Sequence, residues 1–326
     1  MKVLFISPDM SDLNKVRCYT DVWSHFLARE FVEAGIDLQY DPILDLRKFH
    51  QHPMELYRHY ETMKLDGIDH VFGTGLRYFS TLPHQIGNFL RKHIPGAVMQ
   101  YNDGQIIDRQ ERVDMTFTAR GLRNMPAGNM CVGWAADPAL LPSAQPFDQL
   151  VIVVDHPDYT PNSRRDRTAD ILDDVTNFVR AGEWKRAWGS VRVRRIIDGG
   201  FEDVDTSHDG RLDLPFHRGH IPYPQTCAQY SQTHIFLPTH PESVGLTALE
   251  MAVCGALVVA PANFIPPDRM ETIRNVTYTK FIPWGEVLHK LNIPLNREVA
   301  SRNSWSAIGE KIIGFMKGFE KGRVAA

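Results

Sequence analysis

The sequence is poor in the features that mark several classes of protein. Its 326 residues include four cysteines, Cys18, Cys131, Cys227 and Cys254. They stand far apart and lack the spacing of metal ligands, which indicates reduced core residues rather than a disulfide framework. No apolar run reaches membrane-spanning length, and a strand is expected from Val3 onward, too early for a secretory signal. We therefore expect a cytoplasmic protein without a transmembrane segment.

Charge of one sign is also not in excess. The chain has 36 Lys and Arg residues against 39 Asp and Glu residues, a formal net charge of −3 at pH 7. Such a balance gives no global positive field that would recruit nucleic acid. Repeats of solenoid period and low-complexity tracts are missing as well, so the length suits two ordinary domains, each with its own core.

The most informative stretch runs from Ile235 to Pro261. Its first three residues are apolar and predict a strand buried in a parallel sheet. Three apolar residues then recur at helical spacing, Leu246, Leu249 and Val253. Gly255 is placed to end that helix, and residues 256–260 return to a β-branched run. The stretch predicts a βαβ unit whose helix begins above the carboxyl edge of a sheet.

A helix that begins at this edge suits a phosphate group. Its first backbone N–H groups are free, and Gly245 would let a ligand approach closely. Glu242 precedes the helix and Glu250 follows eight residues later, on the order of 10 Å away at the helical rise. A nucleotide sugar is about that long, so one carboxylate could accept hydrogen bonds from a hexose and the other from a ribose.

Residues 242–250, ESVGLTALE, and the following MAVCGALVV resemble the E-x7-E motif of retaining GT-B glycosyltransferases. The usual pattern reads close to EGFGL-x-x-LEAMACG-x-PVV, and Ser243 and Val244 here replace its Gly-Phe pair. The resemblance implies an α/β GT-B protein, with two Rossmann-like doubly wound domains facing a cleft. It assigns Glu242 to the transferred sugar and Glu250 to the ribose.

The resemblance implies further contacts with the donor. The diphosphate would lie against the helix start, formed by Ser243, Val244, Gly245, Leu246 and Thr247. The base would be framed by Gly219, His220 and Ile221. A basic residue after the first strand of the second domain would contact the diphosphate, and the sequence does not choose among Arg164, Arg165 and Arg167. The donor would be a nucleotide diphosphate sugar, with a UDP-sugar as the first expectation, and neither a cofactor nor a metal ion would be needed.

The first half of the chain resembles these enzymes in architecture only. Short strands are expected at 3–6, 38–42, 71–73, 98–101, 115–118 and 131–134, which favours a doubly wound sheet. Asp103 follows a strand end and is a candidate acceptor-side base or sugar ligand; the alternative is an Asn-Asp-Gly turn. The Gly-rich loop common after the first strand is missing from Ser11 to Lys15.

Three domain segments follow from these assignments. Residues 1–145 are expected to form an acceptor-side domain and residues 146–302 a domain that binds the nucleotide sugar. Residues 303–326 are expected to form a helix that crosses back to the first domain.

The function implied is that of a retaining hexosyltransferase that uses a nucleotide diphosphate sugar and an unknown hydroxyl acceptor. A nucleotide-sugar epimerase and a non-catalytic nucleotide-sugar-binding module of the same fold stay open. So does a transferase whose acceptor is a hydroxylated base of DNA. That last alternative rests on the stretch from Trp184 to Arg195, which interleaves aromatic and basic residues; its other interpretation is a solvated edge with tryptophans anchored inward. The acidic stretch from Asp203 to Asp209 lacks the acid at position twelve of an EF-hand loop and is expected to be a hairpin or loop.

Overall fold

The structure is a computed structural model. It describes residues 1–7, 11–16, 19–41, 53–63, 65–74, 84–102, 113–119, 127–144, 148–155, 167–197, 200–204, 206, 221–241, 246–265 and 267–319. The chain forms two compact units, the first made of Met1–Trp134 with Ser304–Ala326 and the second of Ala135–Asn303.

The described part of the first unit contains a parallel sheet of six strands in the order β2-β1-β3-β4-β5-β6. The strands are β1 (Lys2–Ile6), β2 (Asp37–Asp41), β3 (His70–Gly73), β4 (Val98–Asn102), β5 (Met115–Thr118) and β6 (Asn129–Cys131). The helices are η1 (Leu13–Lys15), α1 (Tyr19–Glu33), α3 (Pro53–Thr62), α4 (His84–His93) and α11 (Trp305–Gly318).

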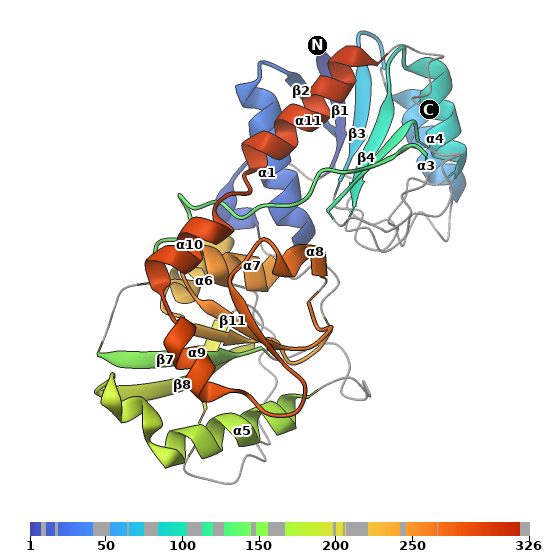
Figure 1. Ribbon diagram of the computed structural model, residues 1–326. Helices are drawn as coiled ribbons and strands as arrows, with labels where there is room; N and C mark the ends of the chain where they lie inside the picture. The colour runs from blue at the N-terminus through green and yellow to red at the C-terminus, as the bar shows by residue number, and fades with distance from the viewer. Residues whose placement is uncertain are drawn as a thin grey trace. The chain divides into compact units, whose positions relative to one another are not determined.

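Helices cover both faces of this sheet. Successive side chains of each strand point to opposite faces, so both faces present apolar side chains on which helices pack. On one face, Leu4 and Ile6 share a buried cluster with residues of α3 and α4. On the other face, Phe5 meets Phe31 of α1 edge to face, with ring centroids 5.9 Å apart. Helix α11 lies beside α1 on that second face (Figure 1).

Helix α11 has the amphipathic pattern that its sequence predicts. The Ser304 side chain accepts a hydrogen bond from the Ala307 N–H at 3.1 Å and caps its first turn. Its buried residues include Trp305, Ile308, Ile312 and Met316, which recur at helical spacing. Gly309 permits close packing, because a Cβ there would lie 2.8 Å from Cβ of Glu30 in α1.

The described part of the second unit contains a second sheet, in the order β12-β11-β10-β7-β8-β9, in which only β9 runs antiparallel to its neighbour. The strands are β7 (Gln149–Val154), β8 (Ser190–Ile197), β9 (Gly200–Asp203), β10 (Ile235–Leu237), β11 (Leu257–Pro261) and β12 (Asn275–Tyr278). The helices are α5 (Thr168–Ala181), η3 (Glu183–Arg186), α6 (Tyr223–Tyr230), α7 (Leu246–Val253), α8 (Pro267–Met270), α9 (Trp284–Lys290) and α10 (Ile293–Ala300). Counted from β7, the strand order is 3-2-1-4-5-6, that of dinucleotide-binding sheets. The predicted fold class, with two Rossmann-like α/β sheets, is confirmed.

The second sheet is also covered on both faces. Helices α5 and α9 meet through stacked rings of Phe178 and Trp284, whose centroids are 4.0 Å apart, over a cluster that contains Leu150, Ile152 and Val154 of β7. Helix α7 packs against α6 and α10, and Figure 1 shows these helices across the sheet from α5.

Several local predictions need correction. The basic stretch after Trp188, for which one interpretation was a solvated edge, forms the eight-residue strand β8, whose alternating Val and Arg residues have the period of a strand. The strand predicted at 131–134 lies two residues earlier, as β6. Cys131 is exposed, whereas Cys227 and Cys254 are buried, so the interpretation as core residues fails for Cys131.

In each unit a buried histidine, in a strand or directly before one, accepts a hydrogen bond from a backbone N–H. In the first, the Ala97 N–H donates to Nδ1 of His70 at 2.9 Å. In the second, the Val151 N–H donates to Nδ1 of His234 at 3.0 Å. An acceptor nitrogen must be unprotonated, so this hydrogen bond requires a neutral ring at His70.

Acidification should destabilise the first unit through His70. Burial lowers the pKa of His70 from its usual 6.5, so the unfolded chain binds a proton at a higher pH than the folded one. The contribution of neutral His70 to the free energy of unfolding is therefore fully present above about pH 6.5. It is lost as the pH falls through the pKa that His70 has in the folded protein. Unfolding by urea between pH 5 and 8 should show this loss in the wild type and a smaller loss in His70→Asn, whose amide oxygen still accepts a hydrogen bond. An identical pH dependence in the two proteins would contradict the assignment.

Candidate functional site

The strand order of the second unit places a topological switch point between β7 and β10. The chain leaves β7 toward β8 on one side and leaves β10 toward β11 on the other, so loops diverge at the carboxyl ends of these two strands. Ligands of open parallel sheets bind at such a crevice. The main chain is held there by hydrogen bonds from the Asp155 N–H to the Leu237 carbonyl and from the Arg167 N–H to the Thr239 carbonyl, both at 2.9 Å.

Polar side chains follow both strand ends at the switch point. Asp155 comes directly after β7 and is 8% exposed, and Thr239 after β10 is fully buried. His240 follows Thr239, and its Nδ1 lies 3.7 Å from Oδ2 of Asp155. Sequence reasoning did not single out Asp155 or His240, although His240 comes three residues after the strand predicted at 235–237.

Helix α7 continues from this loop and matches its prediction. It begins at Leu246, and Gly255 follows it with a positive φ of 104°. A Cβ at Gly255 would lie 2.5 Å from Cγ2 of Ile293, so the position requires glycine for packing as well as for φ. Strands β10 and β11 on either side are paired in parallel, which confirms the predicted βαβ unit.

Glu250 lies on α7 and is 3% exposed. The hydroxyl of Tyr223, the first residue of α6, donates a hydrogen bond to its Oε1 at 2.5 Å. Tyr223 is 4% exposed, so the pair is shielded from water. Tyr223 comes two residues after Ile221, the last residue of the segment predicted to frame the base. This closeness in sequence is the signal that could have identified Tyr223 as a site residue.

Burial dominates the electrostatics of this pair. It raises the pKa of Glu250 to about 8, and the hydrogen bond from Tyr223 opposes the rise. Burial, followed by the nearby Glu250 carboxylate, raises the pKa of Tyr223 well above its usual value. The same two causes raise the pKa values of the thiols of Cys227 on α6 and Cys254 after α7. At neutral pH Glu250 is therefore mostly a neutral acid in the absence of a ligand.

The carboxyl end of α7 is anchored by α10. The Arg297 guanidinium donates hydrogen bonds to the carbonyls of Val253 at 2.6 Å, Leu141 at 2.5 Å and Pro138 at 2.8 Å. The Ala144 N–H also donates to the Cys254 carbonyl at 2.6 Å. Residues 138–144 are thereby held against the end of the helix that carries Glu250.

The other predicted donor residues divide into two groups. Of those described, Leu246 is buried in the first turn of α7, while Thr247 and Ile221 are partly exposed. The remainder lie outside the described residues, as do the predicted sugar ligands: Arg164, Arg165, Gly219, His220, Glu242, Ser243, Val244, Gly245 and Asp103.

Arg167, the third candidate for the diphosphate, is engaged in the fold. Its guanidinium donates to the carbonyls of Thr279 at 3.4 Å and Lys280 at 3.3 Å. It also lies near Asp170 and over the ring of Tyr278. These contacts tie the start of α5 to the loop after β12.

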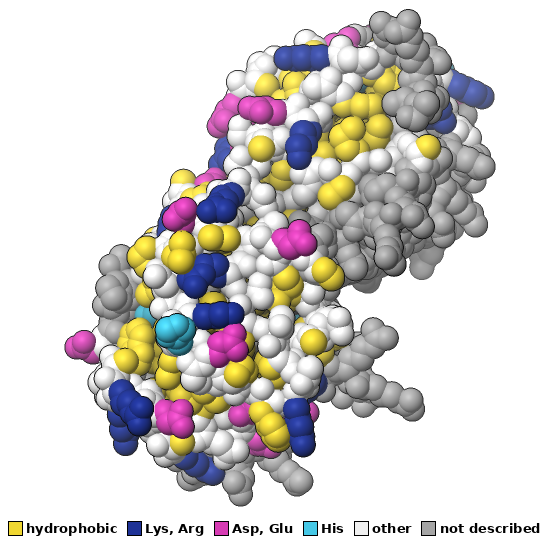
Figure 2. Space-filling model, in the orientation of Figure 1, with side chains coloured by type: hydrophobic (Ala, Val, Ile, Leu, Met, Phe, Trp, Pro, Cys, Tyr) yellow, Lys and Arg dark blue, Asp and Glu magenta, His cyan; other side chains and the backbone are white. Residues whose placement is uncertain are grey.

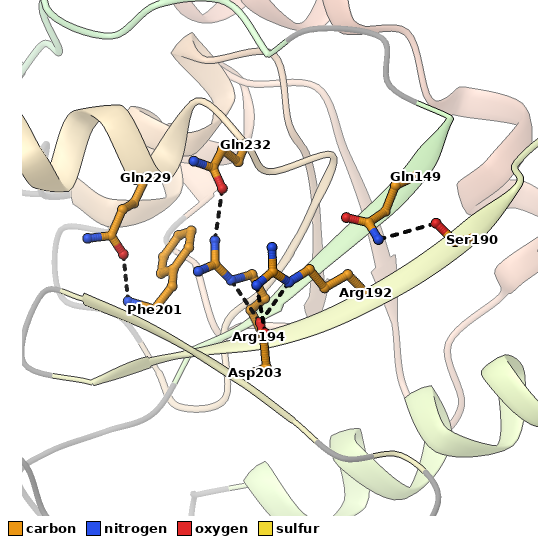
Figure 3. Close-up of polar contacts among 8 residues, drawn as sticks. All are labelled: Gln149, Ser190, Arg192, Arg194, Phe201, Asp203, Gln229 and Gln232. Atoms are coloured by element: carbon orange, nitrogen blue, oxygen red, sulfur yellow. Dashed lines mark hydrogen bonds and ion pairs between the residues drawn. The ribbon is translucent and has the colours of Figure 1, made fainter.

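The basic residues of β8 are neutralised by the neighbouring strand. Arg192 makes two hydrogen bonds to Asp203 of β9, at 2.8 and 2.6 Å, and Arg194 approaches the same carboxylate and bonds Gln232 at 3.0 Å (Figure 3). The hydrogen bonds from Arg192 lower the pKa of Asp203. Arg195 is paired with Glu202 at 2.6 Å. Figure 2 likewise shows basic and acidic side chains interspersed over the face drawn.

At the carboxyl edge of the first sheet, Asn102 is the buried last residue of β4, immediately before Asp103. His59 of α3 bonds buried Asp41, with Nε2 2.9 Å from Oδ1. Within the described ranges, no group of three or more His, Cys, Asp or Glu side chains is placed to hold a metal ion. None of the described helices combines the length and apolar character needed to cross a membrane.

No protein family model matches the sequence, and no curated protein matches it. Solved structures match it in fold. A putative UDP-N-acetylglucosamine 2-epimerase from Listeria monocytogenes is 11% identical over 97% of this chain and 95% of its own, with a TM-score of 0.57. Sucrose-phosphate synthase from Thermosynechococcus elongatus is 11% identical over 97% and 94%, with a TM-score of 0.51. AviGT4, a glycosyltransferase involved in avilamycin A biosynthesis, is 13% identical over 97% of both chains, with a TM-score of 0.51. The likeness establishes that this chain shares the GT-B fold of these proteins.

Proposed function

We propose that this protein is a retaining glycosyltransferase that moves a hexosyl group from a nucleotide diphosphate sugar to a hydroxyl group, without a metal ion. The observation that carries the proposal is the placement of Glu250. It lies on the helix that follows the switch strand β10, in a sheet with the strand order of dinucleotide-binding proteins. An ionised carboxylate there can accept hydrogen bonds from both hydroxyl groups of a ribose, the role that the E-x7-E resemblance assigns to it.

The remaining roles complete the proposal. Glu242 would position the transferred sugar, and the backbone amides at the start of α7 would stabilise charge on the diphosphate. Gly219, His220 and Ile221 would frame the base, and Arg164 or Arg165 would contact the diphosphate. In the reaction, the bond between sugar C1 and the diphosphate oxygen breaks, and the acceptor oxygen bonds to C1. The acceptor proton passes to the leaving diphosphate on the same face of the sugar.

The alternatives differ in what they predict for the acceptor. The structure of β8 weakens the case for DNA as the acceptor. Arg192 and Arg195 are already paired with carboxylates, so they offer less positive charge to a phosphate backbone. An epimerase would convert the nucleotide sugar without any acceptor. For the transferase we propose Asp103 as an acceptor-side group and the first unit as the place of the acceptor.

Nucleotide binding tests the proposal directly. We expect calorimetric titration with UDP, GDP, ADP and their sugars to show selective binding of one base, with UDP tested first. Glu250→Ala should weaken that binding roughly tenfold to a hundredfold, because a hydrogen bond to a charged group contributes about 1.5–3 kcal/mol. The control is Glu286→Ala, whose side chain on α9 is 47% exposed and paired with Lys290; it should bind as the wild type does.

Two outcomes would count against the transferase. If no nucleotide binds at millimolar concentration, a donor site is absent. If the bound nucleotide sugar is converted to an epimer with no acceptor present, the protein is an epimerase of the same fold.

A further inference from the structure

The hydrogen bond from Tyr223 to Glu250 links the two helices that the proposed donor site would use. Tyr223 is the first residue of α6 and comes two residues after Ile221, where the segment predicted to frame the base ends. Glu250 lies on α7 and is the carboxylate proposed to bind the ribose. Helix α6 packs on α7, so the bond connects the end of the predicted base segment to the ribose carboxylate.

The bond restricts the orientation of the carboxyl group. The last torsion of a glutamate side chain is broad, so a carboxyl group without a partner turns easily. Here Oε1 accepts the Tyr223 hydrogen at 2.5 Å, and both side chains are more than nine-tenths buried. Within the described ranges, Oε2 of Glu250 accepts no hydrogen bond. The hydroxyl groups of a ligand would therefore meet a carboxyl group whose direction Tyr223 has already set.

Tyr223 also acts on the charge of Glu250. Burial raises the pKa of Glu250 and so disfavours the carboxylate, whereas the hydrogen bond from Tyr223 favours it. Burial likewise raises the pKa of the Tyr223 hydroxyl well above its usual value, so this hydroxyl keeps its hydrogen and stays a donor. In a complex, the carboxylate would receive the Tyr223 hydrogen together with those of the ribose diol. Without Tyr223 as a donor, the neutral acid would persist in the complex to a higher pH.

The protonation state of Glu250 decides how much a missing ligand hydroxyl matters. Hydrogen bonds to a charged group are roughly twice as strong as those between neutral groups. A site that pairs a buried polar group with a substrate hydroxyl rejects the analogue that lacks the hydroxyl, because the buried group is then left unpaired. An ionised Glu250 should therefore discriminate strongly against a 2′-deoxyribose, and a neutral Glu250 only weakly.

We propose that Tyr223 is a positioning residue that gives the donor site its preference for ribonucleotides over 2′-deoxyribonucleotides. The proposal rests on the proposed function, which assigns Glu250 to the ribose. It adds a residue that acts through Glu250 rather than by contact with the ligand.

The other titratable groups around Glu250 keep one charge state over the pH range of the test. Burial raises the pKa values of the thiols of Cys227 on α6 and Cys254 after α7, so both stay neutral. Arg297 of α10, which lies near Cys254, stays positively charged. A change in discrimination between pH 7 and pH 9 would therefore report on Glu250.

The test compares the affinities of the preferred ribonucleoside diphosphate and its 2′-deoxy analogue, measured by calorimetry at pH 7 and pH 9. Both ligands carry the same base, so ionisation of the base cancels in the ratio of affinities. The wild type should prefer the ribonucleotide by roughly tenfold or more. Tyr223→Phe should reduce this preference to about threefold at pH 7, where its Glu250 stays neutral, and recover most of it at pH 9.

Two further variants complete the test. Glu250→Gln keeps the bond from Tyr223 but cannot ionise, so its preference should be weak at both pH values. The matched control is Tyr278→Phe, because Tyr278 on β12 is buried and, among the described residues, its hydroxyl has no hydrogen-bond partner. Loss of that hydroxyl should leave the preference as in the wild type.

The outcomes separate this inference from the function on which it rests. A wild-type preference in folded Tyr223→Phe at pH 7 would overturn the role of Tyr223 and leave the donor site intact. A reduced preference that does not recover at pH 9 would also overturn it, since it would indicate a general disturbance. A wild-type preference in Glu250→Gln would overturn it as well. If the wild type binds neither nucleotide, both proposals fail.

Discussion

Nucleotide binding is expected to strengthen as the pH rises from 7 to 9. Burial raises the pKa of Glu250 to about 8, so the free protein holds a protonated acid below that pH. A ribose diol donates two hydrogen bonds, and only the ionised carboxylate accepts both. Binding must therefore displace a proton below pH 8, and the affinity should fall by up to about tenfold for each pH unit below the pKa, then level off above it.

The test is a series of calorimetric titrations from pH 6.5 to 9.5 in buffers of different ionisation enthalpy. Proton release should accompany binding below pH 8. Glu250→Gln matches the protonated acid in shape and can still accept the hydrogen bond from Tyr223. It should bind weakly, with a flat pH profile over this range.

Other groups around Glu250 limit how the result can be explained. Tyr223, Cys227 and Cys254 all have raised pKa values, so burial keeps them protonated over most of the range. Tyr223→Phe removes the hydrogen bond that opposes the rise in the pKa of Glu250. The rise in affinity should then move to higher pH. A profile that Glu250→Gln and Tyr223→Phe both leave unchanged would show that another group titrates.

Replacing Arg297 by alanine is expected to give the largest loss of stability. Three backbone carbonyls, those of Pro138, Leu141 and Val253, accept hydrogen bonds from its guanidinium. Removal leaves the last turn of α7 and the segment 138–144 without this charged partner. A hydrogen bond to a charged group contributes about 1.5–3 kcal/mol, and the contributions of three bonds from one guanidinium do not add in full. We therefore expect Arg297→Ala to lower the free energy of unfolding by roughly 3 kcal/mol.

Differential scanning calorimetry checks this expectation. For a unit of this size, ~3 kcal/mol corresponds to a decrease in Tm of about 6–12 °C in the transition of the second unit. The control is Arg302→Ala, because the Arg302 side chain is 67% exposed and its ion pair among the described residues is with Glu298, at 3.4 Å. That change should shift Tm by less than about 2 °C. Equal effects of the two substitutions would mean that the Arg297 contacts contribute little.

The pattern of neighbouring residues was sufficient to predict the βαβ unit on which the assignment of the fold class depends. The unit from Ile235 to Pro261 was predicted with its strand, helix and glycine end, because each depends on neighbouring residues only. The same holds for α11, which lies within the helix predicted for residues 303–326. Strand β8 was missed because its arginines suggested a charged surface, and their carboxylate partners on β9 become evident only when the hairpin forms.

The sequence by itself determined the fold class, the βαβ unit and the candidacy of Glu250, since periodicity and a contiguous motif are written along the chain. Only the tertiary structure decided which side chains meet. Tyr223 reaches Glu250 because α6 packs on α7, and Arg297 reaches Leu141 across a separation of 156 residues. Asp155 lies near His240 because β7 and β10 are neighbours in the sheet, although α5, η3, β8, β9 and α6 come between them in the chain. Burial raises the pKa of Glu250, and this burial results from the same packing of distant segments. The raised pKa therefore could not be predicted from the sequence around Glu250.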